Sequence, residues 1–158
     1  MRLEAYSFEI VYHRVTAQQR DAIVDFWLSY GAIDSTTEAR RRSHQVVVLV
    51  RNPTGEIVGL SSVGLRNIPR LDGWHYIYRM FIRPADRVSY LMKEITNCSR
   101  DFLRSFEHPK LPMRGLLIVT ENRKLMRPGL RKLLLRHGYQ PLGRSTRGLD
   151  WWRVDFRG

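Results

Sequence analysis

The sequence has little of what several common classes of protein require. Cys98 is its only cysteine, which excludes an internal disulfide and any metal site built from several cysteines. No apolar run approaches the roughly 20 residues that a membrane span needs, and the first residues do not begin a signal peptide. We therefore expect a soluble, cytoplasmic protein. We interpret Cys98 as a core or boundary residue on a helix rather than as a reactive thiol.

Several site classes are missing as well. The histidines are scattered along the chain, and no two of them have the spacing of metal ligands. A phosphate-binding loop of the Walker type is absent, and so is the Gly-x-Ser-x-Gly motif of serine nucleophiles. The sequence therefore predicts neither a metal site nor a nucleophile.

Acidic residues are scarce: 15 aspartates and glutamates stand against 27 lysines and arginines, which gives a net charge of +12. Such a charge favours phosphate groups as partners, in a cofactor, in a nucleic acid or in both. The alternative is the solvated surface of an arginine-rich protein. The stretch from Asn122 to Leu149 has no acidic residue, and its basic residues are Arg123, Lys124, Arg127, Arg131, Lys132, Arg136, Arg144 and Arg147. We take the first six of these as candidate nucleic-acid contacts.

The apolar pattern predicts one α+β domain over residues 1–158, long enough to bury its own core. We expect strands over 7–15, 45–51, 57–65, 76–82, 115–120, 139–142 and 149–156. We expect helices over 16–31, 35–43 (or a loop), 88–106 and 128–137, the first opened by a capping box of Thr16 and Gln19. This order predicts a mixed, mostly antiparallel sheet with helices on both faces.

The stretch from Tyr76 to Phe106 has the clearest functional pattern. A strand that ends at Ile82 is followed by Pro84, which cannot donate a ladder hydrogen bond, and then by an amphipathic helix. A helix that opens directly beyond a strand end presents free backbone N–H groups there. Such groups suit an anion, typically a phosphate.

The segment from Met80 to Arg87 (MFIRPADR) resembles part of the GNAT superfamily of N-acetyltransferases. In that family the corresponding segment ends the central strand and begins the loop that holds the pyrophosphate of acetyl-CoA. The segments 119–122 and 137–143 resemble the family's strand-end asparagine and its late Gly-Phe turn, and the element order matches over roughly residues 8–156. The resemblance implies a GNAT-like fold, acetyl-CoA or another acyl-CoA as cofactor, an amine as acceptor, and a homodimer as one possible assembly.

The sequence departs from the family pattern at three parts of the catalytic machinery. Tyr90 and Met92 stand where the family has the glycines of its pyrophosphate loop, so we expect their side chains to crowd that loop. Leu134 stands where many members have a tyrosine that protonates the leaving thiolate. Arg79 replaces the acidic residue that often serves as the base; we expect it either to pair with a buried carboxylate or to face the substrate.

The resemblance implies a set of candidate site residues. Those for the cofactor are Met80, Phe81, Ile82, Arg83, Arg87, Val88, Ser89, Tyr90 and Asn122. Candidate acids are Tyr76, Tyr78, Tyr90 and Tyr139, and candidate bases are Glu121 and His75; from these we take Tyr78, Tyr90 and Glu121 as catalytic candidates. For each tyrosine the alternative is a place in the core or at its rim.

Two hypotheses follow. The first is an acyl-CoA-dependent N-acyltransferase whose acceptor amine could belong to a nucleic acid. The second is a protein of the same fold that has lost acyl transfer and binds nucleic acid or a partner protein. The missing glycines and tyrosine favour the second hypothesis, whereas the retained turn from Pro84 to Arg87 favours the first.

Overall fold

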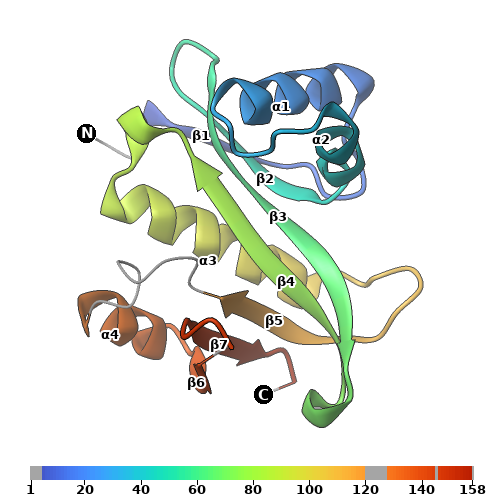
Figure 1. Cartoon of the computed structure of the whole chain (residues 1–158), viewed down its shortest axis with the longest axis vertical. Coiled ribbons are helices and arrows are strands. Elements are labelled where there is room, and N and C mark those ends of the chain that lie inside the picture. Colours follow the sequence, from blue (N-terminus) through green and yellow to red (C-terminus); the bar gives the residue numbers. More distant parts are fainter. Residues whose placement is uncertain (1–4, 120–127, 145, 158) are drawn as a thin grey trace. The chain divides into compact units, whose positions relative to one another are not determined.

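The computed structural model describes residues 5–119, 128–144 and 146–157 (Figure 1). Its strands are β1 (Ser7–Ile10), β2 (Val46–Arg51), β3 (Ile57–Ile68), β4 (Gly73–Ile82), β5 (Met113–Val119), β6 (Gln140–Arg144) and β7 (Asp150–Asp155). Its α-helices are α1 (Ala17–Ser29), α2 (Thr36–Ser43), α3 (Ser89–Ser105) and α4 (Pro128–Arg136), and two 3-10 turns are η2 (Pro69–Leu71) and η3 (Pro84–Asp86). No helix in these ranges is long and apolar enough to cross a membrane.

The strands form one sheet in the order β1-β2-β3-β4-β5-β7-β6. β1 with β2, β2 with β3, β5 with β7 and β6 with β7 pair antiparallel, whereas β4 and β5 pair parallel. The sheet is therefore mixed and mostly antiparallel, which confirms the predicted α+β class. The chain groups into two compact units, one of residues up to Val63 with Arg79–Ser105, the other of Gly64–Tyr78 with the chain from Phe106 onward. A single domain over residues 1–158 stays a prediction.

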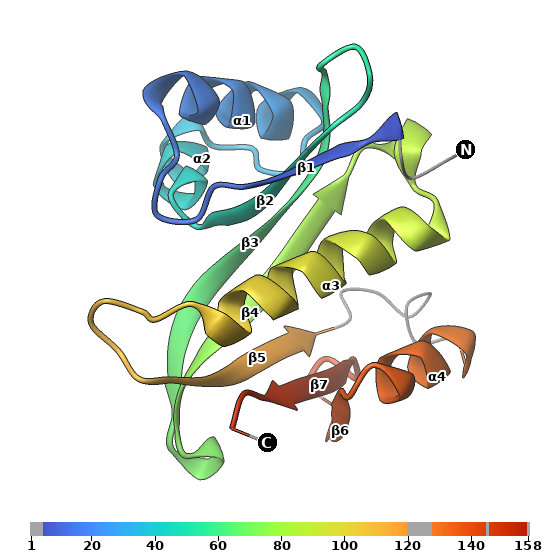
Figure 2. The same ribbon diagram turned by 180° about the vertical axis from the view of Figure 1, so that it is seen from behind.

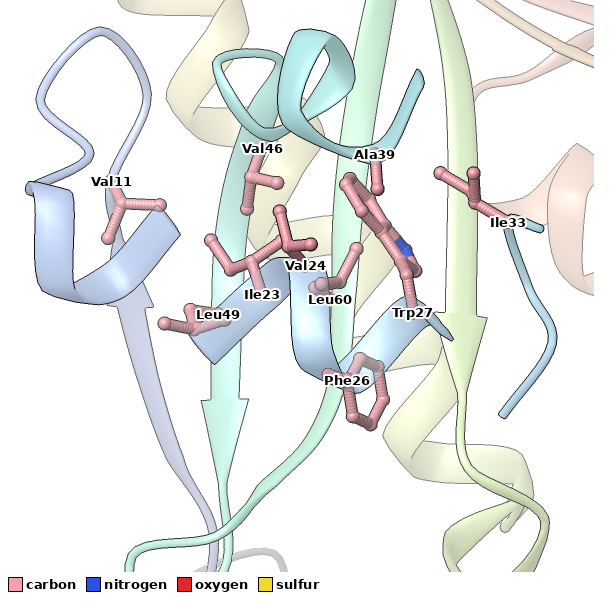
Figure 3. Close-up of a cluster of buried hydrophobic side chains, with 10 residues drawn as sticks. All are labelled: Val11, Ile23, Val24, Phe26, Trp27, Ile33, Ala39, Val46, Leu49 and Leu60. Carbon is pink, nitrogen blue, oxygen red and sulfur yellow. The ribbon is translucent and has the colours of Figure 1, made fainter. Parts of the chain in front are cut away.

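The first unit has helices on both faces of its strands (Figures 1 and 2). α1 and α2 cover one face, where buried apolar side chains of α1 meet those of β2 and β3 (Figure 3). Trp27, whose side chain is 2% exposed, is among the largest of them; burying a side chain of this kind stabilises a fold by roughly 1.5–3 kcal/mol. α3 covers the other face, where Ser61 of β3 and Ser99 of α3 share a buried hydrogen bond of 2.7 Å.

The boundaries of α1 follow from local chemistry that the sequence predicts. The N–H of Gln19 donates to the Thr16 hydroxyl at 3.1 Å, and the N–H of Thr16 donates to the Gln19 side chain at 2.9 Å. These two bonds form the predicted capping box. After the helix the chain turns at Gly31, whose φ of +67° lies in the left-handed region that glycine adopts without steric cost.

Several predicted strands have different lengths in the structure. β1 ends at Ile10, five residues before the predicted end at Val15, because the chain turns at His13, which has a φ of +62°. β3 and β4 are longer than predicted, since the turn η2 followed by Asp72 in the left-handed conformation joins them directly. Of the segment 67–73 between the two predicted strands, residues 67, 68 and 73 therefore belong to the strands, and residues 69–72 form the turn.

In the second unit, β5 passes unusually close to β7. A Cβ added to Gly115 would lie 2.5 Å from the backbone oxygen of Val154 and 3.3 Å from the ring of His75. Backbone atoms of a paired strand cannot move aside cheaply, so only glycine fits at this position of β5.

We expect Gly115→Ala to lower the free energy of unfolding by roughly 1–3 kcal/mol, because the added methyl group overlaps the backbone of β7. Denaturant titration followed by circular dichroism measures this change. The matched control is Gly64→Ala, since a Cβ at Gly64 meets no atom within 4 Å. Equal stability of the two variants would contradict the close approach.

Candidate functional site

The last residues of β4 form an open edge. The N–H of Arg83 donates to the carbonyl of Val58 on β3 at 2.9 Å, and backbone groups of successive strand residues point to opposite sides. Those of Met80 and Ile82 therefore point away from β3. The register between β4 and β5 ends at Tyr78, so Met80 and Ile82 have no strand partner on that side among the described residues. Such an edge can bind an extended ligand through main-chain hydrogen bonds.

A buried carboxylate holds the turn that follows β4. Asp86, the last residue of η3, accepts a hydrogen bond of 2.7 Å from the Tyr6 hydroxyl and forms an ion pair with Arg83. A second carboxylate, that of Glu56, lies 3.6 Å from the Arg83 guanidinium. The turn is thereby tied both to the residue before β1 and to the β2–β3 hairpin.

The pKa values of this group agree with its geometry. Burial alone would raise the pKa of Asp86, but the hydrogen bonds from Arg83 and Tyr6 outweigh it, and the pKa is lowered. Burial, followed by the hydrogen bond to Asp86, raises the pKa of Tyr6 to about 12. At neutral pH Asp86 is therefore an anion and Tyr6 a hydrogen-bond donor.

Arg87 closes the turn from the other side. Its Nε donates to the carbonyl of Ile82 at 2.8 Å, and its guanidinium lies 5.4 Å from the centre of the Phe81 ring. Phe81 in turn packs against Phe26 of α1, with ring centres 5.7 Å apart. The Arg87 side chain is exposed, and its other N–H groups have no partner among the described residues.

The helix α3 begins at Ser89, two residues after Arg87. The Val88 carbonyl accepts from the N–H of Leu91 at 3.1 Å. The N–H groups of Ser89 and Tyr90 precede any intrahelical acceptor, as do those of every first helical turn. Two backbone donors and a guanidinium therefore occur together, which suits an anion such as a phosphate.

Tyr90 stands where the GNAT pattern has a glycine. Its backbone is helical and its φ is not positive, so the conformation itself does not require glycine here. Its side chain is 48% exposed. Tyrosine in place of glycine therefore adds a side chain beside the N–H groups of the first helical turn but does not alter the direction of these groups.

The other candidate proton donors are buried. Tyr76, Tyr78 and Tyr139 are each less than 10% exposed. This burial agrees with the alternative interpretation of these tyrosines as core residues. Leu134, which stands in place of the family's catalytic tyrosine, is buried as well. Tyr90 is the one exposed member of the predicted set.

His75 is unsuited to be a base because both of its ring nitrogens are engaged. Arg153 donates from Nε to His75 Nε2 at 3.2 Å, so the other nitrogen, Nδ1, carries the proton and donates to the Gly73 carbonyl at 2.9 Å. Burial is the main cause that lowers the pKa of His75, and the bond to Gly73 offsets it only in part. Within the described ranges no cluster of histidine, cysteine and acidic side chains could hold a metal ion.

Part of the predicted basic surface neutralises a buried acid. Asp150 is 5% exposed; its carboxylate lies 3.3 Å from Nε of Arg131 and 3.9 Å from Nε of Arg144. Lys132 and Arg136 are exposed on α4. The predicted residues Glu121, Asn122, Arg123, Lys124 and Arg127 lie outside the described residues.

Comparison with known proteins identifies the fold. No family model and no curated protein sequence matches the chain.

Solved structures do match. A GNAT-family acetyltransferase from Streptococcus pneumoniae has a TM-score of 0.66 at 11% identity, over 95% of this chain and 99% of that one. Arabidopsis thaliana NAA60 in complex with acetyl-CoA has a TM-score of 0.64 at 11% identity, over 97% of this chain and 99% of that one. The chain has the GNAT fold. A phosphinothricin acetyltransferase from Sinorhizobium meliloti, solved with acetyl-CoA, shares this fold with a TM-score of 0.63 at 14% identity, over 96% of this chain and 88% of that one.

Two residues that hold the turn after β4, Asp86 and Tyr6, are not among the predicted site residues. Asp86 could have been noticed as an acidic residue inside a turn rich in arginine. Tyr6 carries no such signal, because its partner lies 80 positions away in the chain. Arg83 was predicted to meet phosphate, but the structure engages its guanidinium with Asp86 and Glu56, which leaves Arg87 as the guanidinium available to a ligand.

We expect Tyr6→Phe to lower the free energy of unfolding by about 1.5–3 kcal/mol, because it removes one hydrogen bond to a charged group. Asp86→Asn should lower it by more than this at neutral pH. Because the pKa of Asp86 is lowered in the fold, its contribution is present above the unfolded value of about 3.9 and is lost as the pH falls below it.

The difference between wild type and Asp86→Asn should accordingly shrink as denaturant titrations are repeated from pH 7 down to roughly pH 3. A difference that stays constant over this range would show that the charge of Asp86 does not contribute. Tyr6→Phe serves as the control that removes a hydrogen bond without removing a charge.

Proposed function

We propose that the chain is an acyl-CoA-dependent N-acyltransferase, with acetyl-CoA as the donor and an amine as the acceptor. The observation that carries this proposal is the backbone of Met80 and Ile82, which has no strand partner on one side among the described residues and is followed by the donors of Arg87 and the first turn of α3. An extended ligand that ends in phosphate groups fits both the strand backbone and the donors that follow it. The shared fold with acetyltransferases solved with acetyl-CoA supports it.

Each part of the site has a defined task in this proposal. The backbone groups of Met80 and the N–H group of Ile82 bind the extended arm of the donor, and one of these N–H groups polarises the carbonyl that reacts. Arg87 and the N–H groups of Ser89 and Tyr90 bind phosphate oxygens. Bound acetyl-CoA supplies the thioester whose acyl group passes to the amine.

Acyl transfer also needs a base for the amine proton and an acid for the leaving thiolate. Asp86 and Glu56 are both bound to Arg83, so neither suits the role of the base. Glu121 and a water molecule are the remaining candidates for the base, and Tyr78 and Tyr90 for the acid. Tyr90 has the exposure that an acid needs, and Tyr78 precedes Met80 by two residues on the same face of β4.

The test is a calorimetric titration of the purified protein with acetyl-CoA. We expect saturable binding, and we expect Arg87→Ala to weaken it by roughly 1.5–3 kcal/mol, the contribution of a charge-assisted hydrogen bond. Arg104→Ala, at an exposed position near the end of α3, is the control and should bind like wild type. Absence of binding at millimolar acetyl-CoA would refute the enzyme hypothesis.

A second candidate function is polyanion binding through α4, favoured by the exposed cations Lys132 and Arg136. If this helix binds nucleic acid, the affinity for a single-stranded oligonucleotide should fall steeply between 50 and 200 mM salt. The reason is that binding releases the salt counterions that surround the phosphates of the oligonucleotide. Fluorescence anisotropy measures it, with Lys132→Gln/Arg136→Gln expected to reduce the slope by about 1–2. A flat salt response would exclude this function.

A further inference from the structure

Arg79 is the least expected side chain of β4. It is exposed, although it belongs to a central strand of the sheet. Of the two alternatives for Arg79, its exposure contradicts pairing with a buried carboxylate. Arg79 lies two residues before Phe81, so both side chains are on one face of the strand, about 7 Å apart. Since Phe81 packs against Phe26 of α1, this is the face that α1 and α2 cover in the first unit.

The acid on α2 that interacts electrostatically with Arg79 is already paired. Glu38 of α2 accepts two hydrogen bonds from Arg41, at 2.5 and 3.0 Å. The hydrogen bond from Arg41 is also the main cause that lowers the pKa of Glu38, and Arg79 contributes least among the neighbouring charges. Arg79 itself has no hydrogen bond or ion pair to any residue that the structure describes.

The other carboxylates near the end of β4 are engaged too. Glu56 and Asp86 both bind Arg83. The remaining arginines of α2, Arg40 and Arg42, have partners of their own. Arg40 lies 4.0 Å from Asp21, and Arg42 lies over the ring of Trp27 at 5.5 Å. Arg79 therefore forms no ion pair with a described carboxylate, and its guanidinium is a positive charge next to Met80 that a ligand anion can bind.

An exposed aromatic ring packs against Phe81, which lies on the same face of β4 as Arg79. Tyr30, which follows α1, is 44% exposed, and its ring centre lies 6.3 Å from that of Phe81 and 5.3 Å from that of Phe26. Its hydroxyl takes part in a hydrogen bond with Arg83. The ring is thus held in place by three contacts while much of its surface stays open to a ligand.

We propose that Arg79 and Tyr30 bind the acyl acceptor, and that the acceptor is an amine carrying both an anionic group and a planar ring. This proposal rests on the proposed function, which places the reacting carbonyl beside Met80, the residue after Arg79. The guanidinium fork fits a carboxylate or a phosphate in two parallel hydrogen bonds. The ring of Tyr30 offers a stacking surface of the kind that aromatic pairs use.

The same charges select against other amines. A polyamine or a lysine-rich peptide would bring its cations next to Arg79, which forms no ion pair with any carboxylate that the structure describes. An amine without an anion would displace water from Arg79 without giving it a partner. The acceptor class is therefore narrower than amines in general.

The experiment compares amines that differ only in the anion. Phenylalanine with phenethylamine tests a carboxylate, and pyridoxamine 5′-phosphate with pyridoxamine tests a phosphate. Binding is measured by calorimetry with and without saturating CoA, and acetyl transfer by release of the CoA thiol. We expect the anionic member of at least one pair to bind about 10- to 100-fold more tightly; which pair responds identifies the anion.

Variants assign the preference to the two residues. Arg79→Gln should make the two members of the pair equal, and Arg79→Lys should retain part of the preference, because lysine keeps the charge and loses the fork. Arg104→Gln removes an equal charge from α3, on the opposite face of the first unit (Figure 2), and should change nothing. Tyr30→Leu should reduce the preference for phenylalanine over alanine.

The outcomes separate this proposal from the function on which it rests. Equal binding within both pairs overturns it, as does a preference that survives in Arg79→Gln, and so does failure of all four amines to bind. The acetyl-CoA titration decides the donor independently. A protein that binds acetyl-CoA and ignores the anion would keep the proposed function and lose this acceptor class.

Discussion

The buried carboxylate of Asp86 is the interaction on which the end of β4 depends. It brings together Arg83, which leaves the strand, and Tyr6, which precedes β1. Burying a charge is costly unless hydrogen bonds compensate it, and here both partners do so. Because Arg83 is held in this way, Arg87 alone turns back to the Ile82 carbonyl. The direction of the strand's last residues and the start of α3 follow from this arrangement.

Arginines of this chain fall into two groups with different physical roles. One group neutralises acids inside the fold, as Arg83 does for Asp86 and Arg131 does for Asp150. The other group, to which Arg79 and Arg87 belong, has no acid to neutralise among the described residues. Net charge alone does not distinguish the groups. In the second group, Arg79 lies on β4 and Arg87 in the turn that follows this strand.

Much of the fold could be predicted from sequence because its signals are local. The capping box of Thr16 and Gln19, the break at Pro84 and the apolar face of α3 each depend on residues within a few positions of one another. Strand lengths were predicted less well, since His13 and Asp72 adopt left-handed conformations that their residue types only weakly suggest.

The site was predictable in part. The segment from Met80 to Arg87 was identified from its pattern, whereas the contacts that shape it join positions far apart in the chain. Tyr6 and Asp86 are 80 residues apart, and His75 and Arg153 are 78 apart. A single sequence contains no periodicity that relates such positions. For the same reason the exposure of Arg79, on which its role depends, could be stated only as one of two alternatives.

The long hairpin of β3 and β4 has a consequence for how the chain can be made and divided. The boundary between the two compact units falls after Val63 within β3 and again after Tyr78 within β4. Neither unit is therefore continuous in sequence, and no single cut releases either of them whole. On the ribosome the first unit lacks its last segment until Ser105 has been synthesised. By then the 64–78 part of the second unit already exists, and its remaining strands follow later.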